Sequence, residues 1–399
     1  MPDISFLPFD FDPRGKRVLV RVGMDVVLDE EGDIIDDRRI RECVPTIEYL
    51  ADAGAKVILL TKLGRPKGVE EKLRTDKVAR RLSDIMKRPV AKVGECVGEP
   101  VKRAIDRMEP GDMLFLENVR FYPEESKNDE GFARKLAELA DIYVNECFSV
   151  SHREEASLVA ITRFLPSYGG LLLKKEMDAL ENCIRNPERP FVAILGGSKA
   201  DKIHALRRLV EVADKVLVGG SLGLLLLRAK GLDIHNVKFD AEWAAGLDDD
   251  IKELLRSEKI ILPVDMIAGR EFNEHAVPRR LYVTQMYDGW TGLDIGRKTT
   301  EIFSEVLAGA KTVVWAGPLG CFEWDKFSCG TRSIAQLISG MDATSIIGGG
   351  ETAFAIEKFG FSENISHIST GGGAFMTYIT EGKLVAVEAL KDSKRKWGI

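Results

Sequence analysis

The hydrophobic positions of this chain recur as short continuous runs that alternate with amphipathic segments. The runs are rich in β-branched residues, which is typical of strands buried on both faces of a parallel sheet. They predict strands at 18–22, 56–60, 113–116, 142–144, 191–195, 215–218, 260–263, 312–315, 344–347 and 367–369. Between them, apolar positions at helical spacing predict helices at 41–53, 75–87, 131–140, 202–213 and 299–307.

This alternation over 399 residues predicts two doubly wound α/β domains, each a Rossmann-like parallel sheet covered by helices. A charged amphipathic helix over 171–186 is followed by Asn186-Pro-Glu-Arg-Pro190. Prolines after a helix end it, and a new buried strand begins at Phe191. We therefore expect the domain boundary, with a helical hinge, over 171–190.

Composition and charge narrow the class of protein. Apolar content of 45%, charged content of 30% and a net charge of −6 are those of a globular protein and argue against a general nucleic-acid or membrane-surface binder. The nearly uncharged run 216–227 is too short to span a bilayer, and residues 1–17 hold no apolar signal segment. The six cysteines form no C-x-x-C pair, so buried thiols in a reducing compartment are expected. We expect a cytoplasmic protein, monomer or homodimer, acting on a small molecule.

Two strand-like runs each end in three consecutive glycines, Gly348-Gly349-Gly350 and Gly371-Gly372-Gly373, and each leads into an apolar segment. A glycine turn between a strand and a helix exposes backbone N–H groups at the positive end of the helix, which suits phosphate binding. The alternative is a pair of tight turns that need positive φ. Because two triplets each follow a strand, the pattern favours a phosphate site.

Basic residues follow the predicted strands of the N-terminal half. In open α/β sheets ligands bind outside the carboxyl ends of the strands, where these side chains would converge. Guanidinium groups suit bidentate contact with phosphate and carboxylate, although any single arginine could be a solvated surface residue. The pattern therefore predicts an anionic-substrate pocket formed by Arg21, Arg39, Lys62, Arg65, Arg120, His152 and Arg153.

The C-terminal half carries candidate nucleotide chemistry. A strand and a glycine turn at Gly196-Gly197 precede Lys199 and Lys202, which lie on one helical face and could both reach a polyphosphate. A solvent-facing lysine pair is the alternative. Glu323, in the loop after the strand 312–315, could accept hydrogen bonds from ribose hydroxyls or be a structural loop residue. No G-x-x-x-x-G-K-[ST] motif occurs, and the loose dinucleotide fingerprint lacks its acidic partner.

These segments, in this order, resemble the phosphoglycerate kinase family over nearly the whole chain. The resemblance is carried by Leu116-Glu-Asn-Val-Arg-Phe-Tyr-Pro-Glu-Glu125, Asp288-Gly-Trp-Thr-Gly-Leu-Asp-Ile-Gly296, Gly317-Pro-Leu-Gly-Cys-Phe-Glu-Trp324, Ser345-Ile-Ile-Gly-Gly-Gly350 and His367-Ile-Ser-Thr-Gly-Gly-Gly-Ala374. The ending, over 366–390, looks closer to archaeal members.

The resemblance implies reversible phosphoryl transfer between ATP and the carboxylate of 3-phosphoglycerate, with Mg²⁺ and closure about a hinge. It implies an acceptor domain over 1–170, a hinge over 171–190, a nucleotide domain over 191–385, and a segment over 386–399 that returns to the acceptor domain. Arg39, Lys199 and Gly371–Gly373 match catalytic positions. Nucleotide contacts are implied for Gly197, Lys199, Lys202, Gly219, Gly317, Glu323, Gly349, Gly350, Glu351 and Thr352, with Glu351 beside the metal.

The chain departs from the family pattern at the site itself. Gly23 and Asp25 replace an acidic residue and an amide that would contact the acceptor, and Lys62 replaces a histidine. Glu154 and Glu155 replace alanine and histidine beside Arg153. The remaining departures are a shorter Lys199–Lys202 loop, Ala316 for asparagine and Glu351 for aspartate.

Added carboxylates oppose a second anion unless they pair with arginine. Two alternatives to this kinase stay open. Gly23, Asp25 and Lys62 favour a kinase for another phosphorylated carboxylate, and the shorter Lys199–Lys202 loop favours a non-catalytic nucleotide-binding relative.

Overall fold

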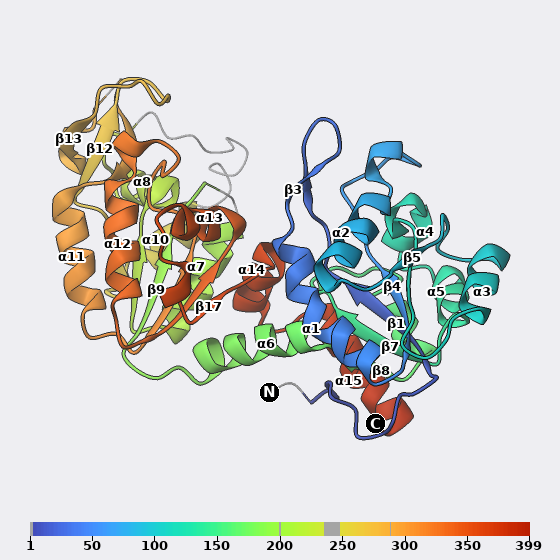
Figure 1. Cartoon of the computed structure of the whole chain (residues 1–399). Coiled ribbons are helices and arrows are strands. Elements are labelled where there is room, and N and C mark those ends of the chain that lie inside the picture. The colour runs from blue at the N-terminus through green and yellow to red at the C-terminus, as the bar shows by residue number, and fades with distance from the viewer. Residues whose placement is uncertain (1–2, 199–200, 235–247, 288) are drawn as a thin grey trace. The chain divides into compact units, whose positions relative to one another are not determined.

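The computed structural model describes residues 3–198, 201–234, 248–287 and 289–399 (Figure 1). It divides into two compact units. Unit 1 comprises Met1–Asp178 and Lys383–Ile399, and unit 2 comprises Ala179–Gly382. Each unit contains a six-stranded parallel sheet, which confirms the predicted α/β class.

The sheet of unit 1 has the order β5-β6-β4-β1-β7-β8, with every neighbouring pair parallel. Its strands are β1 Arg17–Val22, β4 Lys56–Leu60, β5 Ala91–Lys92, β6 Met113–Phe115, β7 Ile142–Glu146 and β8 Ser167–Gly169. The chain runs outward from β1 through β4 and returns to β7 on the other side of β1. This reversal of strand order is a topological switch point, where ligands of doubly wound sheets bind. Arg21 lies there, in register with Leu60 and Asn145.

The helices of unit 1 cover this sheet with apolar faces. They are α1 Arg38–Asp52, α2 Asp76–Met86, α3 Glu99–Asp106, α4 Pro123–Ser126, α5 Glu130–Ala137, most of α6 Leu171–Leu180, and α15 Val385–Trp397. Ile47 and Leu50 of α1 belong to one buried cluster with Val18, Val20 and Leu59 of the strands. Helix α15 packs against β8, so the last residues of the chain complete unit 1.

The sheet of unit 2 has the order β11-β10-β9-β15-β16-β17, again parallel throughout. Its strands are β9 Phe191–Leu195, β10 Lys215–Val218, β11 Ile260–Ile261, β15 Thr312–Ala316, β16 Thr344–Gly348 and β17 His367–Ile368. Here the strand order reverses between β9 and β15. Strands β9 and β15 are buried along their whole length, as their uninterrupted apolar sequences predict.

The described helices of unit 2 are α7 Asp201–Val212, α8 Gly220–Ala229, α10 Asp248–Leu254, α11 Arg297–Leu307, α12 Cys329–Ser339, α13 Gly350–Lys358 and α14 Gly372–Glu381. Helices α7, α8, α13 and α14 each begin just after a strand of the parallel sheet. Their N-termini, with the positive ends of the helix dipoles, therefore lie at its carboxyl edge.

Several elements differ from the sequence prediction. Unit 1 also contains a short antiparallel hairpin, β2 Val27–Leu28 with β3 Ile34–Asp36. An antiparallel sheet of β12 Asp265–Gly269, β13 Arg279–Tyr282 and β14 Thr291–Ile295 was not predicted, because β13 is mostly exposed and charged and lacks a continuous apolar run. The helix expected over 171–186 changes at residue 181 to a π-helical segment, Glu181–Arg185.

The cysteines and the helix lengths can be compared with the sequence expectations. All six cysteines are free thiols, and four of them are buried: Cys43, Cys96, Cys147 and Cys183. Within the described ranges, each helix is too short or too polar to cross a membrane.

Candidate active site

Arg21 is a guanidinium held inside unit 1 at the end of β1, with no exposed surface. Its Nε donates to Ser157 Oγ at 2.9 Å and its Nη1 donates to the carbonyl of Val22 at 2.9 Å. The Ser157 hydroxyl in turn donates to Glu125 at 2.6 Å. Burial opposes the charge of Arg21, but nearby acidic groups, Cys147 and Glu125 among them, keep its pKa raised. The charged guanidinium is therefore a fixed part of the site.

Glu155 gathers three arginines around one buried carboxylate. Arg120 Nη2 donates to Glu155 Oε1, and Arg153 Nη1 lies 3.8 Å from the same oxygen. Arg21 Nη2 lies 3.8 Å from the other oxygen, Oε2. Arg21 lies at the carboxyl end of β1, and Arg120 lies in the 3₁₀ turn Val119–Phe121 after β6. Arg153 and Glu155 lie in the loop after β7. The structure thus brings three of the predicted cations together around Glu155. In the sequence, this glutamate was noted only as a departure from the family pattern.

Asp25 organises a second group of cations. Lys62 Nζ donates to Asp25 Oδ2, and the backbone N–H of Gly64 donates to Oδ1 at 2.8 Å. Arg39 Nη1 donates to the Asp25 carbonyl at 2.6 Å and lies 3.8 Å from Oδ2. Burial lowers the pKa of Lys62, whereas the ion pair with Asp25 opposes that shift. The positive charge of Arg21 also lowers the pKa of Lys62. Arg21 therefore links the two groups electrostatically.

Three other residues predicted for the acceptor site, Arg65, Gly23 and His152, form no described salt bridge to Glu155 or Asp25. Arg65 is exposed. Gly23 faces Cys147, because a Cβ on it would lie 3.4 Å from the Cys147 Sγ. His152 is half-buried, and burial lowers its pKa, which favours the neutral imidazole near pH 7. Glu154 is exposed, in contrast to Glu155.

In unit 2, the glycine loops after β9 and β15 meet at the reversal of strand order. The N–H of Gly197 donates to the carbonyl of Pro318 at 3.0 Å. Gly197 has φ of 80° and Gly317 has φ of 93°, conformations that favour glycine. A Cβ on Gly220, at the start of α8, would lie 2.9 Å from the Gly197 nitrogen. Gly219 precedes α8 and donates to the carbonyl of Leu195 at 2.9 Å.

The two glycine triplets also abut. A Cβ on Gly372 would lie 3.1 Å from the Cα of Gly349, which has φ of 95°. Gly349 precedes α13 and Gly371 precedes α14, so the two helix N-termini stand side by side. Paired N-termini concentrate positive partial charge and exposed N–H groups, which is a favourable place for phosphate.

The predicted polar residues of unit 2 lie in different surroundings. Lys202, on α7, is buried, and its Nζ lies 3.2 Å from the Sδ of Met376 on α14. Glu323 and Glu351 are exposed, and the Glu323 carbonyl accepts a hydrogen bond from Lys358 Nζ at 2.9 Å. The predicted position of Lys199 lies outside the described residues.

No cluster of three or more His, Cys, Asp or Glu side chains suited to a metal ion occurs among the residues described. Mg²⁺ is commonly held by one or two carboxylates together with substrate phosphates. Glu351, in the first turn of α13, is a carboxylate placed beside the glycine loops and fits that mode.

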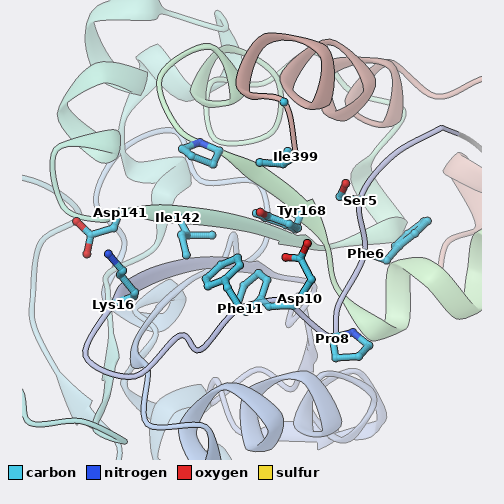
Figure 2. A pocket seen from close by; sticks show the side chains of 13 residues that line it. Ser5, Phe6, Pro8, Asp10, Phe11, Lys16, Asp141, Ile142, Tyr168 and Ile399 are labelled. Atoms are coloured by element: carbon cyan, nitrogen blue, oxygen red, sulfur yellow. The ribbon is translucent and has the colours of Figure 1, made fainter.

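A pocket of about 580 Å³ lies at the opposite edge of the unit 1 sheet (Figure 2). Lys16 and Asp141, which line it, precede β1 and β7, whereas Arg21 stands at the carboxyl end of β1. Phe9, Phe11 and Tyr168 supply aromatic walls. This pocket is therefore separate from the cation groups.

A doubly wound α/β protein with clustered cations in one unit and abutting glycine loops at helix N-termini in the other belongs to the class that binds phosphate and carboxylate groups. The family model described as phosphoglycerate kinase matches residues 9–383. The chain is 44% identical to the phosphoglycerate kinase of Moorella thermoacetica over 387 residues, covering 96% of this chain and 98% of that one. It is likewise 44% identical to the Nostoc punctiforme protein of that name over 390 residues, with 96% and 97% covered.

Solved structures give the same result. The phosphoglycerate kinase of Coxiella burnetii superposes with a TM-score of 0.86 at 32% identity, covering 96% of this chain and 98% of that one. That of Pyrococcus horikoshii gives 0.85 at 30% identity, covering 98% and 100%. The chain belongs to the phosphoglycerate kinase family, kinases that transfer a phosphoryl group between ATP and 3-phosphoglycerate.

Proposed function

We propose that this chain catalyses reversible phosphoryl transfer between ATP and the carboxylate of 3-phosphoglycerate, with unit 1 holding the acceptor and unit 2 the nucleotide. The observation that carries the proposal is the gathering of cations at the carboxyl edge of the unit 1 sheet, around Asp25 and Glu155. These cations exceed the two carboxylates in number and can neutralise a multiply charged acid. In this proposal Arg39, which lies beside Asp25, orients the acceptor carboxylate.

In the nucleotide unit, the glycine loops supply the groups that a polyphosphate needs. The N–H groups at the starts of α13 and α14 would donate hydrogen bonds to phosphate oxygens, and Lys202 would add a positive charge near the transferred group. Gly371–Gly373 would stabilise the charge on the phosphoryl group in transit. Glu351, together with the nucleotide phosphates, would hold Mg²⁺, whose charge would offset that of the phosphates.

The remaining assignments follow the same proposal. Glu323 would contact the ribose, and Lys199 would share with Lys202 the role of neutralising phosphate charge. Arg65 and His152 would line the acceptor pocket. We propose residues 171–190 as the hinge, a cytoplasmic location, and a monomeric or homodimeric protein without a nucleic-acid or membrane partner.

A coupled assay with ATP, Mg²⁺ and 3-phosphoglycerate tests this function directly. Arg39→Ala should reduce turnover at least tenfold, because the guanidinium beside Asp25 is lost. Arg38→Ala is the matched control, since Arg38 is the neighbouring arginine and bonds exposed Asp36 instead. Wild-type turnover no faster than that of Arg39→Ala would reject 3-phosphoglycerate as the acceptor.

A second candidate is a kinase for a different phosphorylated carboxylate. The observation that favours it is that Lys62 and Arg39 already pair with Asp25, which changes the groups offered to an acceptor hydroxyl. Screening phosphorylated acids for ATP-dependent ADP release separates the two candidates, and a preference for 3-phosphoglycerate excludes the second.

A further inference from the structure

The charges around Glu155 do not balance. Three guanidinium groups, those of Arg21, Arg120 and Arg153, approach one carboxylate, and two of them lie 3.8 Å away rather than in hydrogen-bond contact. The second nearby carboxylate, Glu125, is linked to Arg21 through the Ser157 hydroxyl, so three guanidinium groups face two carboxylates. The group therefore keeps an excess of positive charge.

Some N–H groups of the arginines around Glu155 also lack a hydrogen-bond acceptor. Among the described residues, Arg21 Nη2 and Arg120 Nε are buried without a hydrogen-bond partner, as is Glu155 Oε2. Buried polar atoms are normally paired, and unpaired ones call for a partner such as a water, a bound ion or a substrate group. An anion entering beside Glu155 would find free N–H groups on Arg21 and Arg120, and would meet a carboxylate that already holds Arg120.

We infer that Glu155 sets the affinity for the acceptor, because its carboxylate competes with the phosphate group of the acceptor for the Arg120 and Arg153 guanidinium groups. The inference rests on the proposed function only in taking the acceptor to carry a phosphate. Like charges in one site oppose each other, so binding must displace Glu155 from Arg120 or accept its repulsion. Glu155 therefore weakens acceptor binding while it holds the arginines in place in the empty site.

The test uses inorganic phosphate and 3-phosphoglycerate as probes, with binding measured by calorimetry on the full chain without nucleotide. Glu155→Gln removes the competing charge and keeps the size of the side chain, and Glu154→Gln makes the same change at the exposed neighbour. Glu155→Gln should bind inorganic phosphate about tenfold more tightly than wild type. Glu154→Gln should stay within about threefold, because water and salt screen an exposed charge. Equal or weaker phosphate binding by Glu155→Gln would overturn the inference.

Thermal unfolding shows whether a change in phosphate affinity comes from the binding site or from a poorly folded variant. Without Glu155 the arginines lack a counter-ion, so phosphate should raise the melting temperature of Glu155→Gln more than that of wild type. Glu155→Asp retains the charge on a shorter side chain and should give intermediate phosphate affinity. If Glu155→Gln is unfolded, an unchanged affinity in folded Glu155→Asp counts against the inference.

Kinetics distinguish this inference from the proposed function. Glu155→Gln should lower KM for 3-phosphoglycerate with KM for ATP unchanged, whereas a purely structural role would reduce kcat and raise KM. If no variant turns over 3-phosphoglycerate but phosphate still binds more tightly to Glu155→Gln, the proposed function fails and the competition stands. Turnover with unaltered phosphate affinity and KM refutes the competition alone.

Discussion

The backbone N–H of Gly317 donates a 2.7 Å hydrogen bond to the hydroxyl of Thr352. This bond joins the loop after β15 to the first turn of α13, and both groups are buried. Gly317 also has a positive φ, a conformation that glycine adopts readily and other residues rarely do. Thr352 therefore holds the glycine loop after β15 against α13, the helix that follows the first glycine triplet.

Replacing Thr352 by valine should loosen the glycine loops of unit 2. The change keeps the shape but leaves the Gly317 N–H buried without a partner, which costs about 1–3 kcal/mol of unfolding free energy. KM for ATP should rise several-fold, with KM for 3-phosphoglycerate unchanged. Thr300→Val is the control, because that hydroxyl only bonds the carbonyl of Gly296 one turn earlier. Equal effects of the two variants in urea unfolding and steady-state kinetics would contradict the prediction.

Asp25→Asn should destabilise unit 1 far more than a comparable change at the surface. Lys62 is buried, and without the carboxylate its ammonium group stays desolvated and unpaired. We expect a loss of roughly 2–4 kcal/mol in urea unfolding. Asp33→Asn, which breaks an exposed pair with Lys77, should cost less than about 1 kcal/mol. A similar loss in both variants would show that the buried pair has no special weight.

Gly372→Ala should separate the two abutting glycine loops. Its Cβ would lie 3.1 Å from the Cα of Gly349, and that neighbour is backbone, which has to move. We expect kcat to fall by about tenfold or more, since a small misplacement of catalytic groups is costly. At Gly340, an added Cβ lies 3.6 Å from its nearest neighbour, so Gly340→Ala serves as the control. Unchanged kcat in folded Gly372→Ala would contradict the assignment of this loop.

Glu146 gives unit 1 a dependence of stability on pH. Burial raises its pKa to about 7, from an ordinary value of 4.5. The folded protein therefore holds this proton more tightly than the unfolded chain, so the stabilisation is complete below about pH 4.5 and is lost as the pH rises through about 7.

The neutral Glu146→Gln variant should show a shallower dependence and gain roughly 1–3 kcal/mol over wild type at pH 8. Part of the dependence remains, because burial also raises the pKa of Glu125 and of Asp294 to about 7. Urea unfolding between pH 5 and pH 8 measures the difference. The exposed control Glu138→Gln, which only loses its pair with Lys102, should keep the wild-type slope. A wild-type slope in Glu146→Gln would mean that the carboxylate is already ionised at pH 5.

The parallel strands could be predicted from the sequence because their signal is local. A run such as Phe191–Leu195 is apolar at every position and flanked by turn residues, so the pattern itself indicates burial on both faces. The glycine triplets were likewise visible, since they are a local sequence pattern, although only Gly349 among them has the positive φ that favours glycine. The antiparallel strands β12, β13 and β14 could not be found this way, because β13 is polar and exposed and is fixed only by its partner β12.

The sequence by itself determined the α/β class, the positions of the cations at strand ends, and the departures at Asp25 and Glu155. It did not determine what those carboxylates do. Asp25 meets Lys62 across 37 residues of chain, and Arg120 meets Glu155 across 35. Such pairs depend on strand order and on burial, which set the distance between charges and the dielectric around them. Only the tertiary structure therefore decided that the added acids are counter-ions of the cations.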